Sequence, residues 1–292
     1  MREIKNDSLK VCIQEKGASL WSIKDDSGNE YLWQGDPKYW ADRAPNLFPY
    51  IARLTEGKYR LDGKTYEMDI HGFAKDSVFE VADSTQQEIT FRLRDTGETY
   101  RQYPYRFEFD ISYRLEEKKL FVIFTVKNED EKVMYFGVGG HPGFRVPMEE
   151  GLTFEDYRLE FDTIKEAKRV GFSEDCFVTG EKERFELAEG RILSLRHGMF
   201  DEDAIVLTDM AHSVTLVSEK GKRAIRVAYS DMDFLGLWHM PKTDAPYICI
   251  EPWSSLPSRK GILEDLETQP NLISLAPGNT YVAQFSIELV DR

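Results

Sequence analysis

The chain has 292 residues, of which 41% are hydrophobic and 31% are charged, a composition that excludes a disordered protein. Its formal net charge of −14 repels phosphate backbones and anionic lipid surfaces, so we expect no nucleic acid and no membrane as a partner. The aromatic content of 13% favours β structure and, since aromatic rings stack on sugar rings, also a carbohydrate ligand.

The first residues are charged and lead into no apolar stretch, so we expect no signal peptide and a cytoplasmic protein. The most apolar windows, such as Leu120–Val126, are too short to cross a bilayer. The three cysteines, Cys12, Cys176 and Cys249, are widely separated and lack the spacing of metal ligands. We therefore expect three reduced thiols, no disulfide bond and no metal site.

Short runs of alternating polar and apolar residues dominate the chain and predict β-strands. The clearest is 106–113, where Phe107, Phe109, Ile111 and Tyr113 fall on one face. Further strands are expected at Glu88–Arg94, Lys119–Lys127, Val133–Val138, Ala204–Thr208, Ser213–Ser218, Arg223–Ala228, Ala245–Ile250 and Gln284–Val290. Short strands separated by turns at this spacing are typical of a β-sandwich or barrel. We expect one domain over residues 1–292.

Helical patterns are scarce, and the best candidate is the short amphipathic stretch Gly261–Glu267. Strands do not alternate with long helices, which argues against a doubly wound α/β fold, and no fixed-period repeat suggests a propeller. The sequence also lacks the motifs of nucleotide, zinc-protease and serine-hydrolase sites. We therefore expect no cofactor.

A few isolated polar residues stand in unusual settings. Arg53 follows an apolar, proline-bracketed segment, so it is suited to donate paired hydrogen bonds to hydroxyls or a phosphate, or to form a structural salt bridge. His71 precedes a glycine after a β-like run, where a turn histidine is an equal interpretation. Asp201 lies in an acidic loop before Ala204–Thr208, and such loop residues are usually just solvated.

Two residues have stronger settings. His141 stands between a glycine and a proline after an apolar run, and a histidine at a rigid strand end suits proton transfer near neutral pH. Glu251 follows the apolar strand Ala245–Ile250 and precedes a proline and a tryptophan, so we expect it to end the strand partly desolvated. Desolvation raises the pKa of a carboxyl group and makes it a better base. A backbone-bonded turn histidine and a strand-end glutamate in a surface ion pair are the alternatives.

Taken in chain order, these motifs resemble the aldose 1-epimerase (galactose mutarotase-like) family, in its LacX-like branch. The matching stretches are Asn46-Leu47-Phe48-Pro49 with Arg53, His71-Gly72-Phe73, Gly140-His141-Pro142 with Phe144, Phe200-Asp201-Glu202-Asp203-Ala204, and Ile250-Glu251-Pro252-Trp253. They span most of the chain. The resemblance implies an all-β, galactose-mutarotase-like β-supersandwich with a sugar-binding cleft.

The resemblance also implies a reaction, the interconversion of the α and β anomers of a hexose without a cofactor or metal. Glu251 would remove the proton of the anomeric hydroxyl, and His141 would protonate the ring oxygen and open the ring to the aldehyde. The binding residues implied or suggested are His71, Arg53, Asp201, Lys75 and Trp238, the tryptophan being a stacking platform or a core residue.

The identity of the sugar stays open. The sequence His-Gly-Phe-Ala-Lys differs from the double-glycine form of galactose mutarotases, and branches with a basic residue here include enzymes that act on hexose 6-phosphates. Lys75 and Arg53 could then hold the phosphate. A non-catalytic sugar-binding or sensing protein and a polysaccharide-active enzyme are further alternatives. The expected partner is a small sugar, and the chain would be a monomer or homodimer.

Overall fold

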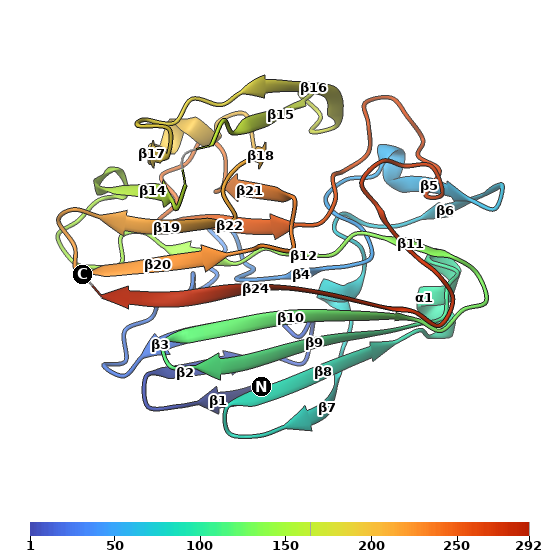
Figure 1. Ribbon diagram of the computed structural model, residues 1–292, viewed down its shortest axis with the longest axis horizontal. Helices are drawn as coiled ribbons and strands as arrows, with labels where there is room; N and C mark the ends of the chain where they lie inside the picture. The colour runs from blue at the N-terminus through green and yellow to red at the C-terminus, as the bar shows by residue number, and fades with distance from the viewer. Residues whose placement is uncertain (164, 292) are drawn as a thin grey trace.

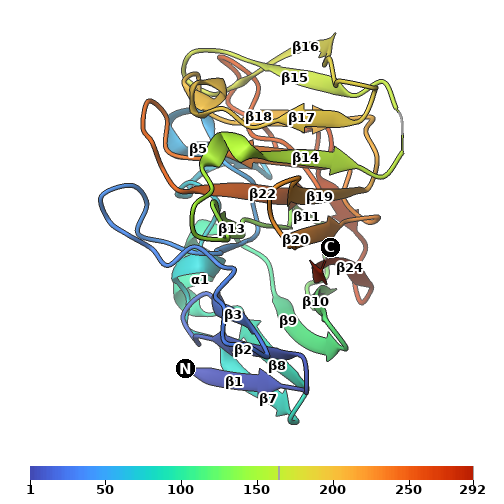
Figure 2. The same cartoon turned by 90° about the vertical axis from the view of Figure 1, so that its left-hand side faces the viewer.

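Antiparallel β-sheets are the main regular structure of the molecule, a computed structural model that describes residues 1–163 and 165–291 (Figures 1 and 2). Of the expected domain 1–292, Ile164 and Arg292 thus lie outside the described residues. The predicted all-β class is confirmed. In the described part of the chain, no helix has the length and apolar character that a membrane span requires.

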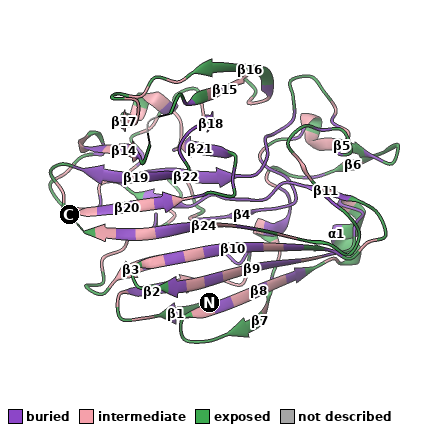
Figure 3. Ribbon diagram, viewed as in Figure 1, coloured by how far each residue is buried: buried purple, intermediate pink, exposed green. Residues whose placement is uncertain are grey.

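A nine-stranded sheet forms one layer (Figure 1). Its strands are, in spatial order, β17 (Ile192–Ser194), β14 (Tyr157–Phe161), β19 (Ser213–Ser218), β20 (Arg223–Ala228), β24 (Thr280–Asp291), β10 (Lys119–Asn128), β9 (Phe107–Glu116), β8 (Glu88–Arg94) and β7 (Glu80–Ser84). Along β8, β9 and β10 buried residues alternate with more exposed ones, so the sheet has a core face and a face nearer solvent (Figure 3).

An eight-stranded sheet forms the second layer and carries the residues of interest. Its strands are β16 (Val178–Arg184), β15 (Lys168–Phe172), β18 (Ile205–Thr208), β21 (Phe234–Trp238), β22 (Tyr247–Trp253), β12 (Gly139–Gly140) and β4 (Asn46–Leu47), with β13 (Gly143–Arg145) also paired to β22. Every residue of β22 is buried (Figure 3). Ile248 and Ile250 face the main hydrophobic core, whereas Tyr247, Cys249 and Trp253 lie on the opposite face in separate clusters.

Smaller sheets and helices complete the structure. They are β1 (Arg2–Lys5), β2 (Leu9–Ile13) and β3 (Leu20–Asp25); β5 (Lys58–Leu61) and β6 (Lys64–Glu67); β11 (Met134–Phe136) and β23 (Ile273–Leu275); the helix α1 (Gly97–Gln102); and the 3₁₀ turns η1 (Thr55–Gly57), η2 (Ala74–Asp76), η3 (Phe154–Asp156) and η4 (His197–Phe200). The main core draws side chains from β1–β3 and from both large sheets.

Most predicted strands are confirmed, and 88–94, 213–218 and 223–228 match in both bounds. The predicted helix Gly261–Glu267 is wrong. Arg60 of β5 donates its N–H to the carbonyl of Glu264 and accepts a hydrogen bond from the N–H of Leu266, so these backbone groups pair with a strand instead of with each other. The sequence analysis missed α1, which Thr96 begins with a capping box.

Candidate active site

His141 and Glu251 face each other because of how β12, β13 and β22 pair. His141 lies in the short connection between β12 and β13, and both strands pair with β22. The residue pairs that flank this connection are Gly139 with Trp253 and Gly143 with Cys249. The register between them places His141 opposite Glu251, although 110 positions separate the two in the sequence (251 − 141).

The expectation that Glu251 ends its strand is wrong. It lies inside β22, which continues to Trp253 because that residue still pairs with Gly139 on one side and Phe234 on the other. Gly236 of β21 lies beside Glu251, and a Cβ added there would come within 3.2 Å of the Glu251 Cβ. A glycine therefore leaves space for the carboxylate in the middle of the sheet.

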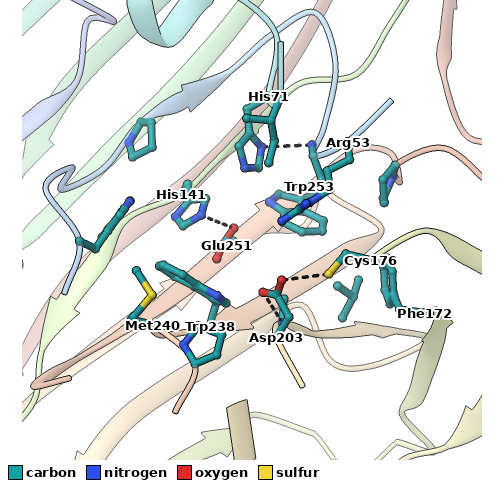
Figure 4. Close-up of a pocket in the computed structure, with 18 of the residues that line it drawn as sticks. Arg53, His71, His141, Phe172, Cys176, Asp203, Trp238, Met240, Glu251 and Trp253 are labelled. Carbon is teal, nitrogen blue, oxygen red and sulfur yellow. Dashed lines mark hydrogen bonds and ion pairs between the residues drawn. The ribbon is translucent and has the colours of Figure 1, made fainter. Parts of the chain in front are cut away.

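The pair is withdrawn from water. His141 is 8% and Glu251 1% exposed, and His141 Nε2 lies 3.2 Å from Glu251 Oε2 (Figure 4). Burial lowers the pKa of His141 to about 4. Burial also raises the pKa of Glu251 well above its ordinary value, and the charge of Asp203 adds to this effect. A proton shared by the pair therefore lies preferentially on Glu251 and not on His141.

His71 is fixed as a neutral hydrogen-bond donor. Its backbone is left-handed, with φ 66°, and its N–H donates to the carbonyl of Ala52 at 2.9 Å. In return, the N–H of Ala52 donates to His71 Nδ1 at 3.1 Å. Burial, and after it the neighbouring His141, keep the pKa of His71 well below its ordinary value. Because Nδ1 accepts, the neutral ring carries its proton on Nε2.

A cavity of about 480 Å³ opens beside these three residues (Figure 4). The predicted site residues that line it are Arg53, His71, Lys75, His141, Trp238 and Glu251. The lining residues that the sequence analysis did not single out include Trp40, Phe172, Cys176, Asp203, Met240 and Trp253. The structure thus gathers all but one of the predicted residues around a single space.

Asp201 is the exception. It is exposed, does not line the cavity, and accepts a hydrogen bond from the backbone N–H of Lys242 at 3.2 Å. Asp203, two positions later, lines the cavity instead, and its left-handed backbone (φ 79°) re-aims the chain before β18. Asp203 Oδ2 accepts a hydrogen bond from the Cys176 thiol at 3.0 Å (Figure 4). Burial and this bond raise the pKa of Cys176 to about 11, so the thiol stays protonated.

Two tryptophans form an aromatic corner over the acid–base pair. Trp238 is half-buried and lines the cavity, so it is not only a core residue. Trp40 comes from the loop between β3 and β4, and its ring centroid lies 5.0 Å from His141 and 5.6 Å from Trp238. The Trp40 carbonyl accepts a hydrogen bond from Trp33 Nε1 of the same loop at 2.8 Å, and the Trp33 N–H donates to the carbonyl of Gly143 in β13 at 2.8 Å, which ties the loop to the sheet. The sequence analysis missed Trp40 because no motif around it distinguishes it from an aromatic residue at the surface.

Comparison with known proteins identifies the family and the fold. The profile of the aldose 1-epimerase family matches residues 2–288. Protein LacX (chromosomal) of Lactococcus lactis subsp. lactis is 33% identical over 297 residues, covering 99% of each chain. A galactose mutarotase related enzyme from Lactobacillus acidophilus has a TM-score of 0.94 at 34% identity, covering 99% of this chain and 96% of that one. A galactose mutarotase-like protein from Lactobacillus casei gives a TM-score of 0.94 at 33% identity, covering 99% of each. The fold is galactose-mutarotase-like.

Proposed function

The chain belongs to the aldose 1-epimerase family, and we propose that it interconverts the α and β anomers of a free hexose by acid–base ring opening. The observation that carries the proposal is the 3.2 Å contact between His141 Nε2 and Glu251 Oε2 at the wall of the cavity. The anomeric hydroxyl and the ring oxygen of a sugar are bonded to the same carbon. An acid and a base that serve both oxygens must therefore lie this close together.

The reaction moves two protons. With the shared proton on His141, Glu251 is a carboxylate and takes the proton of the anomeric hydroxyl, while His141 gives its proton to the ring oxygen. The bond between the anomeric carbon and the ring oxygen breaks, and the aldehyde forms. Rotation about the next carbon–carbon bond and closure by the reverse transfers give the other anomer.

Burial favours this ring-opening step. After opening, Glu251 carries a proton and His141 is neutral, which is the state that their raised and lowered pKa values already favour. Once the shared proton is on His141, the low-dielectric site thus favours both transfers, and the net charge of the pair does not change. The same pKa values make that starting form the less populated one. Acid–base assistance of this kind is worth roughly two to four orders of magnitude in rate.

The remaining cavity residues would hold the sugar. His71 offers the Nε2–H donor derived above, and the carboxylate of Asp203 accepts hydrogen bonds from hydroxyls. Arg53, which is exposed at the cavity, supplies a forked donor. Trp40 and Trp238 offer apolar ring faces to the C–H side of the sugar.

The charges around the cavity favour a free hexose over a hexose 6-phosphate. The cations among its lining residues are Arg53 and Lys75, and the Lys75 ammonium already pairs with the carboxylate of Asp76. Asp42, Glu202 and Asp203 also line the cavity and add three carboxylates to it. A phosphate dianion would meet this acidic surface, so the phosphate alternative is the weaker candidate.

Polarimetry tests the proposal. Freshly dissolved α-glucose and α-galactose should reach anomeric equilibrium faster with the protein than in buffer alone, and glucose 6-phosphate should gain less. If none of these sugars equilibrates faster than in buffer, the proposed activity is wrong and a non-catalytic sugar-binding role gains support. If glucose 6-phosphate responds best, the choice of a free hexose is wrong.

A further inference from the structure

Cys249 lies beside the acid–base pair but takes no part in the proposed reaction. It stands two positions before Glu251 on β22, so both side chains project from the same face of the strand. Its partner in the register on one side is Gly143, which has no side chain, and on the other side Trp238. The thiol is fully buried and forms no disulfide bond.

The fold brings three metal-ligating groups together here. A nitrogen of His141, the Sγ of Cys249 and a carboxylate oxygen of Glu251 all lie within 4.8 Å of one another, and the three residues are buried. Zinc binds sulfur at about 2.3 Å and nitrogen or oxygen at about 2.0–2.2 Å, so its ligand atoms lie roughly 3.2–3.8 Å apart. The side chains therefore need to move by only about 1 Å to enclose such an ion.

A second observation points to the same place. Glu251 Oε2, in a residue that is 1% exposed, lies 3.2 Å from His141 Nε2 in a geometry that forms no hydrogen bond, and it has no other hydrogen-bond partner among the described residues. A buried acceptor without a partner is costly, by about 1–3 kcal/mol, and a cation would satisfy it. His141 and Glu251 also line the cavity, which offers an ion a route from solvent and room for a water as fourth ligand.

The ligand set selects the class of metal. A thiolate, an imidazole and a single carboxylate suit zinc and cadmium, whereas magnesium and calcium prefer several oxygen ligands. We propose that His141, Cys249 and Glu251 bind one thiophilic divalent cation of this class, and that the bound ion inhibits the isomerisation. The inhibition rests on the proposed function, because the ion occupies the acid and the base; the binding does not. The ion displaces the thiol proton to solvent, since the thiolate is the form that binds metal.

Cadmium titration of the chelator-treated protein tests the binding, because a cadmium–thiolate bond has its own ultraviolet absorption band. The wild type should bind one cadmium ion with this band, and Cys249→Ala should lose the band. Cys176→Ala is the matched control, since the Cys176 thiol lines the cavity but lies outside the three-residue cluster, and it should keep the band. In His141→Asn the band should need at least roughly 10-fold more cadmium, since even the loss of a group that only supports a metal ligand costs about 10- to 100-fold in affinity.

The outcomes that overturn the site are distinct. No band in the wild type, a band kept by Cys249→Ala, or a cadmium affinity unchanged in His141→Asn would each show that no three-ligand site exists. Cys249→Ser replaces Cys249→Ala if alanine at this buried position does not fold.

Anomer-exchange rates with and without zinc test the inhibition, each variant being compared with its own zinc-free rate. Zinc should slow the wild type and Cys176→Ala, and it should slow Cys249→Ala at least about tenfold less effectively. A wild-type rate that bound zinc leaves unchanged contradicts the inhibition. A wild type that shows no exchange without metal contradicts the proposed function, and the cadmium band then still decides the site.

Discussion

Burial, rather than a cluster of charged neighbours, determines the chemistry of the acid–base pair. Glu251 is surrounded by the buried strand β22 and its neighbours, and no arginine or lysine forms an ion pair with it among the described residues. The carboxylate is therefore held in its basic, easily protonated range. The acidic cavity residue that affects Glu251 is Asp203, whose charge raises the same pKa further.

The structure places Asp203, and not the expected Asp201, at the cavity. We predict that Asp203→Asn raises KM for the sugar roughly tenfold, since it loses a charged acceptor worth more than a neutral hydrogen bond. Asp201→Asn is the matched control, because the amide oxygen can still accept from Lys242, and it should stay within about twofold of the wild type. Steady-state kinetics of both variants measure these KM values. A larger rise in KM for Asp201→Asn would show that Asp201, and not Asp203, binds the sugar.

The sequence could not separate these two acids. Phe200-Asp201-Glu202-Asp203-Ala204 places three carboxylates in a row, and a loop gives no period from which to tell which one faces inward. The left-handed φ of Asp203 decides it, and because positions 201 and 203 are both aspartate, the residue type does not tell which of them adopts that angle. For His141 and Glu251 the local settings alone leave a turn histidine and a surface ion pair as equal or better interpretations, and it is the ordered set of family motifs that singles the two residues out.

Among the structural elements, the segment 254–272 between β22 and β23 shapes one side of the cavity. Pro257 lines the cavity, and the N–H of Ser258 donates to the carbonyl of Arg53 at 3.0 Å. The segment is held by Arg259, whose guanidinium lies 2.8 Å from the fully buried carboxylate of Glu264. The sequence suggested a helix here because its apolar spacing is helical, but the ion pair and the β5 strand determine the actual path.

We predict that Arg259→Met lowers the free energy of unfolding by about 1–3 kcal/mol, because the buried Glu264 carboxylate loses its charged partner. KM should rise as well, since the segment supports Arg53. Arg184→Met is the control: Arg184 forms ion pairs only at the exposed surface, and its removal should change stability by less than about 0.5 kcal/mol. Chemical denaturation measures both, and equal losses in the two variants would contradict the role of the buried pair.

At the scale of the whole molecule, strand content was predictable but strand order was not. Alternation marked β8, β9 and β10, which are neighbours in both sequence and space. However, β10 pairs with β24, and β12 pairs with β4 and β22, so the sheets join segments far apart in the chain. Local patterns carry no information on such pairings. The cavity forms only once these distant strands meet.

We infer that the chain unfolds as one domain, since the main core shares side chains from β1–β3 and both large sheets. Trp33, Trp40, Trp238 and Trp253 gather on the cavity side of the eight-stranded sheet, so tryptophan fluorescence reports mainly on that region. Far-ultraviolet circular dichroism reports on all strands. Denaturation curves from the two probes should coincide. Two separate transitions would instead divide the molecule into independent units.

The most direct test of the acid–base pair is the rate of α/β exchange of glucose at equilibrium, measured by NMR exchange spectroscopy. The wild-type protein should exchange the anomers faster than buffer. Glu251→Gln and His141→Asn, with circular dichroism spectra like the wild type, should each lose roughly 10²- to 10⁴-fold of the catalysed rate, because each removes one proton transfer. A near-wild-type exchange rate in either folded variant would contradict the assignment of His141 and Glu251 as the acid and the base.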